Sequence, residues 1–242
     1  ATETGALGPT LPGPLTVYTV GTAGSTADLV NCARELANQS SLSLAFEPKA
    51  GRGYRLLEGV AARPQKALPF TMPRTASFDD LISSVISSSL MHFMANWTSL
   101  RDSDAPESVH QLRVALRRMR SALGIFRKAI TLPELEDIRA EARRIASALG
   151  PARECDAFRQ NALAGPFRNE PKRFKAAALL LEVVEERRQE SYTIARRTID
   201  DPATTLFVLD VQAFLLRRSW RMAIPAQDLG LLTSEARTFA GP

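Results

Sequence analysis

The segment at residues 107–130 constrains the fold most, because its apolar side chains repeat at the three- and four-residue spacing of an α-helix. At about 100° per residue these side chains fall on one face of the helix. The apolar face consists of Leu112, Leu116, Met119, Leu123, Phe126 and Ile130. A stripe of this width needs a partner surface, so the segment is predicted to be one helix of a larger helical core.

The opposite face of this helix is basic. The cations on or beside it are Arg113, Arg117, Arg118, Arg120 and Lys128. His110 begins the basic face, where it fits either a hydrogen-bond donor to phosphate or a neutral residue that bridges helices within the bundle. Gly124 has no side chain to protrude from this face. Guanidinium groups at turns about 5.4 Å apart suit a row of anions, because each can bind phosphate through two parallel hydrogen bonds. We expect Arg113, Arg117 and Arg120 together to carry binding, although the same pattern also fits a solvated face that binds nothing.

Composition limits the remaining function classes. The net charge of the 242 residues is only +5, so an anion site requires a local concentration of cations. The two cysteines are too few for a disulfide framework and lack metal-ligand neighbours, so neither a metal nor a cofactor is predicted. We find no signal peptide and no apolar run long enough for a membrane span, so a cytoplasmic location is expected.

The chain changes character near residue 75. Before it, we predict strands at 15–20 and 41–46, a helix at 26–38 capped by Ser25, and a short apolar piece at 54–57. After a proline-rich linker, the pattern is helical, and Gly150-Pro151 is expected to end a helix. The predicted helices span residues 77–100, 107–130, 133–149, 171–199 and 203–220. Short connections between long helices favour a mainly α, antiparallel up-and-down bundle with a small N-terminal α+β remnant.

Two motifs in the helical part resemble the CHAD family, the conserved histidine α-helical domains. They are VHQLRVALRRMRSAL at residues 109–123 and LGPARECDAF at residues 149–158. His92 with Asn96 is similar to the histidine pattern of the first helix of that family. The resemblance implies binding of inorganic polyphosphate along a basic surface or central channel, with a link to polyphosphate granules or phosphate metabolism.

The segment at residues 48–56, PKAGRGYRL, is similar to the closing segment of a CYTH domain, which often precedes CHAD. CYTH triphosphatases hold their metal with a Glu-x-Glu-x-Lys strand, and this chain lacks that motif, so no catalytic residue is assigned. We therefore predict a CYTH-like remnant at residues 1–62, a linker at 63–76 and a CHAD-like bundle at 77–242. A second His-x-x-Arg helix is absent, so the bundle resembles the first half of a CHAD domain, and self-association is expected.

The motifs and the basic face together nominate nine polyphosphate-binding residues. They are His92, His110, Arg113, Arg117, Arg118, Arg120, Lys128, Arg153 and Arg188. His92 also fits a satisfied core histidine, and Arg153 also fits an ion pair with Asp156, three residues later. Arg188 lies near the apolar side of its helix and needs an anion partner, either ligand or carboxylate. Arg143 fits plain solvated charge.

Three functions remain open from the sequence. The first is a polyphosphate-binding module without enzymatic activity. The second is part of a CYTH–CHAD inorganic triphosphatase whose catalytic strand is missing from this chain. The third is a helical adaptor that binds protein or nucleic acid, although nucleic acid is not expected because aromatic residues do not interleave with the basic face.

Overall fold

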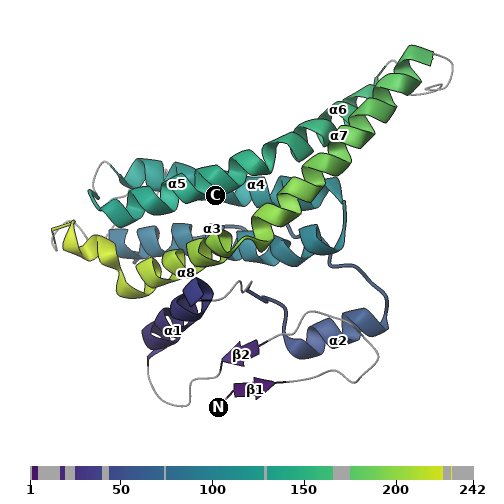
Figure 1. The fold of residues 1–242 in the computed structure, drawn as a ribbon. Coiled ribbons are helices and arrows are strands. Elements are labelled where there is room, and N and C mark those ends of the chain that lie inside the picture. Colours follow the sequence, from purple (N-terminus) through teal and green to yellow (C-terminus); the bar gives the residue numbers. More distant parts are fainter. Residues whose placement is uncertain are drawn as a thin grey trace.

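The computed structural model describes residues 2–4, 17–19, 25–39, 44–73, 75–127, 130–165, 175–225 and 230. Long helices form a bundle, and a smaller N-terminal part lies against one side of it (Figure 1). The bundle elements are α3 (Phe78–Asp102), α4 (Pro106–Phe126), α5 (Pro133–Ala148), α6 (Gly150–Ala164), α7 (Lys175–Asp200), α8 (Pro202–Arg217) and the 3-10 helix η2 (Ser219–Met222). The predicted mainly α bundle is confirmed.

Local sequence signals place several helix boundaries. Ser77 Oγ accepts a hydrogen bond from the Asp80 amide at 3.1 Å, and the Asp80 carboxylate accepts one from the Ser77 amide at 3.0 Å. This capping box satisfies two backbone donors at the start of α3, as predicted. Pro106 and Pro133 lie in the first turns of α4 and α5, where a missing amide hydrogen costs nothing.

The prediction that a helix ends at Gly150-Pro151 and is followed by a loop is confirmed only in its first part. Helix α5 ends at Ala148 as expected, but α6 begins at Gly150 and continues to Ala164, where no helix is predicted from the sequence. Leu149 between them keeps a helical backbone, with φ −79° and ψ −11°. Because proline is tolerated in a first helical turn, Pro151 starts the next helix instead of a loop.

The N-terminal part contains β1 (Thr2–Thr4), β2 (Val17–Thr19), α1 (Thr26–Gln39) and α2 (Lys49–Leu57). The predicted strand at 15–20 is confirmed as β2, which pairs antiparallel with β1, and the predicted helix at 26–38 is confirmed as α1. Residues 44–46 of the predicted second strand form no strand, and residues 54–57 belong to α2. The Phe46 ring packs edge-on against Trp97 at 5.1 Å instead, because the bundle offers it an apolar surface.

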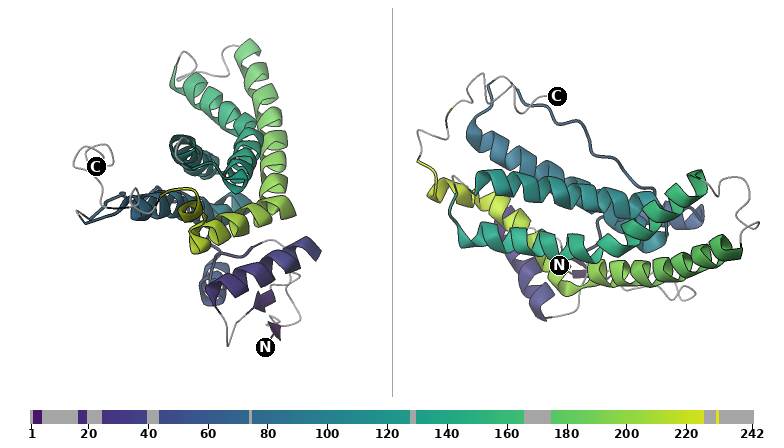
Figure 2. Two further views of the ribbon diagram at one scale, coloured as in Figure 1. Left: turned by 90° about the vertical axis from the view of Figure 1, so that its left-hand side faces the viewer. Right: turned by 90° about the horizontal axis from the view of Figure 1, so that it is seen from above.

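The packing of the bundle leaves one side of α4 open. Seen from above, α4 lies between α3 and α5 (Figure 2, right). Helix α8 packs under α3 and α5, and α1 covers α8 on the far side through Val30 and Ala37. Helices α6 and α7 form a hairpin that projects beyond the bundle (Figure 1). Across the described ranges, no helix is both long and apolar enough to cross a bilayer.

The buried carboxylate of Asp79 links η2 to the start of α3 through hydrogen bonds and ion pairs. Its carboxylate accepts hydrogen bonds from Trp220 Nε1 and Arg221 Nη2, each at 2.6 Å, and it also pairs with Arg218. The Arg221 hydrogen bond is the main reason why the pKa of Asp79 falls to about 2. A depressed carboxyl pKa stabilises the fold at neutral pH, and this contribution is lost as the pH falls from 3.8 towards 2.

Candidate anion-binding surface

Helix α4 separates its apolar and basic side chains as the sequence predicts. Leu112, Leu116, Met119 and Leu123 are fully buried between the neighbouring helices. On the outward side Arg117 is exposed, and four further basic side chains are partly exposed. Those four are His110, Arg113, Arg118 and Arg120. The structure therefore leaves five of the nominated residues at least partly exposed, with Arg113, Arg117 and Arg120 on one side of α4 and Arg118 towards His92 of α3. Lys128 lies outside the described residues.

The arginines of this surface have no acidic partner among the described residues. Among the residues that the structure describes, Arg117, Arg118 and Arg120 form no ion pair or hydrogen bond. The only carboxylate on α4 is Glu107 in the first turn, which accepts a hydrogen bond from Gln111. Glu154 on α6 lies near Gly150 and Arg113, but the described residues give Arg117 and Arg120 no carboxylate within ion-pair distance, so their positive potential is not offset by direct pairing.

Many arginines on other helices are paired with carboxylates. Arg34 pairs with Asp210 at 2.8 Å, and Arg101 pairs with Asp200 at 3.0 Å. Similar pairs join successive turns of one helix, two helices, or a helix and a loop, with Arg144, Arg159, Arg187, Arg196 and Arg217 as the cations. The mild net charge of the chain is thus distributed unevenly, and α4 carries a concentration of unpaired arginine.

Arg113 combines exposure with a structural contact. Its Nη1 donates a 2.5 Å hydrogen bond to the carbonyl oxygen of Ala146 in the last turn of α5. A Cβ on Gly150 would lie 3.3 Å from the same nitrogen, so glycine leaves room for the guanidinium. A cation at a helix C-terminus is favourable because the last carbonyls carry partial negative charge. Arg113 therefore caps α5 with one of its five donors and leaves the others available.

His92 lies below this surface and holds the linker. Its Nε2–H donates to Gln111 Oε1 at 2.9 Å and to the Gln65 carbonyl oxygen at 3.1 Å. Asn96 exchanges two further hydrogen bonds with the Gln65 backbone, at 2.8 and 2.9 Å. His92 is only 5% exposed, and burial lowers its pKa, with the positive charge of Arg118 acting in the same direction. The structure thus buries His92 against α4, near Arg118, and does not expose it beside the other nominated residues.

We expect the attachment of the linker to weaken in acid. A lowered histidine pKa means that the fold favours the neutral ring, so stability is lost as the pH falls below the ordinary value near 6.5. Protonation would place a hydrogen on His92 Nδ1, which is buried without a partner among the described atoms. Hydrogen exchange of the Gln65 amide, corrected for intrinsic rate, should therefore be faster at about pH 5.5 than at about pH 7.5.

The two histidines of the chain provide the control for this measurement. The pH dependence should disappear in His92→Gln and persist in His110→Gln. Persistence in His92→Gln would assign the titration to another group.

Arg188 and Asp156 form a buried pair that joins α7 to α6. Arg188 Nε donates to Asp156 Oδ1 at 2.7 Å, and the Tyr192 hydroxyl donates to Asp156 Oδ2 at 2.7 Å. The guanidinium also lies 4.5 Å from the centroid of the Tyr192 ring. The anion partner that the sequence required for Arg188 is therefore a carboxylate of the protein. The expected Arg153–Asp156 pair is wrong, and Arg153 is partly exposed with no partner among the described residues.

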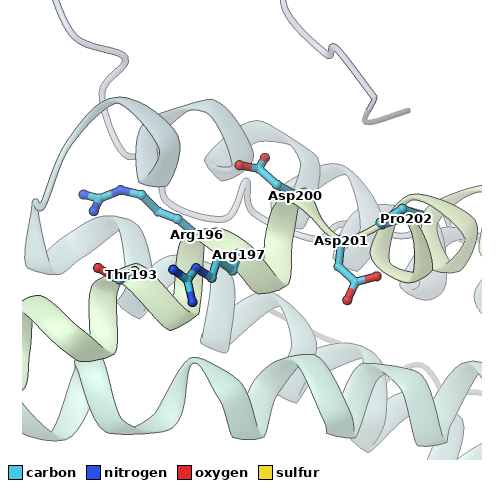
Figure 3. Close-up of a pocket in the computed structure, with 6 residues that line it drawn as sticks. All are labelled: Thr193, Arg196, Arg197, Asp200, Asp201 and Pro202. Carbon is cyan, nitrogen blue, oxygen red and sulfur yellow. The ribbon is translucent and has the colours of Figure 1, made fainter. Parts of the chain in front are cut away.

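A separate hollow lies where α7 meets α8, with a volume of ≈540 Å³ (Figure 3). Its lining is of mixed charge. The lining residues are Thr193, Arg196, Arg197, Asp200, Asp201 and Pro202. Asp200 pairs with Arg101, and Asp201 caps α8 by accepting from the Ala203 amide at 2.8 Å. The two carboxylates make this hollow a poor match for a polyanion.

Arg139 of α5 was not among the nominated residues, yet it borders the α4 surface. Its Nη2 lies 4.0 Å from the position of a Cβ on Gly124. The space beside Gly124, where α4 has no side chain, is thus occupied by the Arg139 guanidinium from the next helix. The sequence contained the signal for a helical hairpin here, but not the register that brings these two residues together.

Comparison with known proteins agrees with this fold. A sequence profile of the CHAD domain matches residues 84–240. The crystal structure of the CHAD domain from the plant Ricinus communis superposes with a TM-score of 0.57 and 23% sequence identity. The similarity covers 64% of this chain and 51% of that chain, so the protein spans about half the length of the plant domain.

The search of curated proteins found no match. The profile match begins at residue 84, so it does not test the resemblance of residues 48–56 to a CYTH domain. It covers more than half of the chain and includes both motifs noted in the sequence. The chain therefore belongs to the CHAD domain family.

Proposed function

We propose that this protein binds inorganic polyphosphate through the outward face of α4. The observation that carries the proposal is the row of arginines on α4 that have no carboxylate partner among the described residues. Membership of the CHAD family supports the same ligand, since the resemblance in the sequence already implied polyphosphate.

The physical basis is neutralisation of charge along a flexible chain. A polyanion surrounded by condensed counterions releases them when arginines take their place, and this release drives binding. Arginine forks at successive helical turns can meet phosphates with little demand on ligand shape. The mixed hollow at the α7–α8 junction lacks this property, because two carboxylates lie beside its two arginines.

A salt titration with long-chain polyphosphate tests the proposal. A slope of about −0.7 per phosphate contact, the value for single-stranded polyanions, predicts about −3 for four cations in a plot of log affinity against log salt. Isothermal titration calorimetry over a series of salt concentrations measures this slope. Duplex DNA at the same phosphate concentration serves as the competitor. Absence of binding at low salt, or equal displacement by the duplex, would contradict a polyphosphate site.

A further inference from the structure

Two contacts fix how α4 lies against α5 and α6. Gly124 faces Arg139, and Arg113 Nη1 lies against Gly150. In both pairs the two residue numbers add up to 263, as expected for two helices that run antiparallel at constant register. The hydrogen bond from Arg113 to Ala146 falls within one turn of the same register.

The same register places further cations opposite one another. Arg120 on α4 falls opposite Arg143 on α5. His110 falls opposite Arg153 on α6, because α6 continues from α5 with a single intervening residue. The row from residue 110 to residue 124 is about 21 Å long at 1.5 Å per residue.

Helix α5 has two edges of opposite character. One edge faces α8, where Glu134 pairs with Arg217 at 2.5 Å and Arg144 donates to Thr204 at 3.1 Å. Arg139 and Arg143, one turn apart, lie on the other edge, which the contact with Gly124 places against α4. Arg143 is exposed and has no partner among the described residues.

From this geometry we propose that the ligand lies in a basic seam between α4 and α5–α6, and not along α4 alone. The basic seam consists of Arg113, Arg117 and Arg120 on one side and Arg139, Arg143 and Arg153 on the other. Arg139 and Arg143 are thus further binding residues. This inference rests on the proposed function and narrows it to a single flexible chain of anions, which two rows of guanidinium groups can contact from both sides.

Electrostatics favours this arrangement. Two facing rows of cations repel each other when the seam is empty, and an anion chain between them removes that repulsion. Carboxylates lie near the ends of the seam: Glu136 pairs with Arg139 at 3.4 Å, and Glu154 Oε1 lies 4.0 Å from the position of a Cβ on Gly150. The middle of the seam, around Arg120 and Arg143, has no carboxylate partner within the described ranges.

The double variant Arg139→Gln/Arg143→Gln tests the seam. We expect long-chain polyphosphate to bind about tenfold more weakly and the salt slope to become shallower by roughly one contact or more. The matched control is Arg187→Gln/Arg197→Gln, which removes the same charge from exposed positions of α7. The control should bind like the parent. If the first variant melts at a lower temperature than the parent, Arg143→Gln alone provides the same comparison at an exposed site.

The outcomes separate this inference from the proposed function. Parent-like binding by the α5 variant, with weakened binding by variants of α4, would overturn the seam and leave the α4 site standing. Failure of the parent to bind would overturn both. Triphosphate serves as a second test ligand in the same binding experiment, because it is too short to span the seam. Equal affinity per phosphate for triphosphate and long chains would also overturn the seam.

Discussion

Reversing the charge of Arg117 and Arg120 is expected to lower polyphosphate affinity by at least about a hundredfold at roughly 0.1 M salt. The double change Arg117→Glu/Arg120→Glu replaces attraction with repulsion at the centre of the surface. Neither side chain contacts another described residue through a hydrogen bond or ion pair, so the fold should not depend on them. Calorimetry measures the affinity, and far-UV circular dichroism measures the helical content, which should equal that of the parent.

Arg113 is left out of this variant for a structural reason. It caps the end of α5 through Ala146, so its reversal would alter stability and binding together. The control Arg187→Glu/Arg197→Glu makes the same change in net charge on α7 and should bind within about twofold of the parent. If the α7 control lost as much affinity as the α4 variant, binding would depend on net charge and not on the α4 surface.

Removing the Asp156 carboxylate is expected to destabilise the protein by about 3–5 kcal/mol. In Asp156→Ala, the Arg188 guanidinium loses its buried charge partner and keeps the partly exposed Glu185 at 3.2 Å, and the Tyr192 hydroxyl loses its acceptor. Both members of the pair are almost fully buried, at 3% and 5% exposure, so water cannot replace the lost interaction. Since small domains have only about 5–15 kcal/mol of stability, urea denaturation should show a large shift of the midpoint.

Glu190→Ala is the matched control for this loss. Glu190 pairs with Arg187 on the same helix at 3.1 Å, but both side chains are about two-thirds exposed. An exposed pair contributes about 0–1 kcal/mol, so this variant should unfold near the parent midpoint. The double variant Asp156→Leu/Arg188→Met should recover most of the lost stability, because apolar residues need no charge partner. Equal effects of Asp156→Ala and Glu190→Ala would show that the buried pair is dispensable.

Whether a feature of this protein can be predicted from its sequence depends on how far apart in the chain the interacting residues lie. The apolar and basic faces of α4 were predictable because the helical period depends only on neighbouring residues. The capping box at Ser77 and Asp80 was predictable for the same reason. The start of α6 was not, because Gly150-Pro151 fits both the end of one helix and the first turn of another.

Side-chain pairs between different helices are harder to predict from the sequence. Asp156 had Arg153 as a partner three residues away in sequence, yet it pairs with Arg188, 32 residues later. The choice depends on the faces that α6 and α7 turn towards each other, and no local pattern specifies those faces. His92 likewise left two readings open until the Gln65 backbone was found beside it.

The helical period of residues 107–126 is enough to predict that α4 presents a row of basic side chains opposite a buried stripe. Which of these arginines remain unpaired depends on how the helices pack, because their potential partners lie on other helices. Arg188 and Arg217 meet carboxylates in this way, whereas Arg117 and Arg120 meet none among the described residues. Tertiary packing also brought Arg139 beside Gly124, since the register of two antiparallel helices depends on the shapes of both.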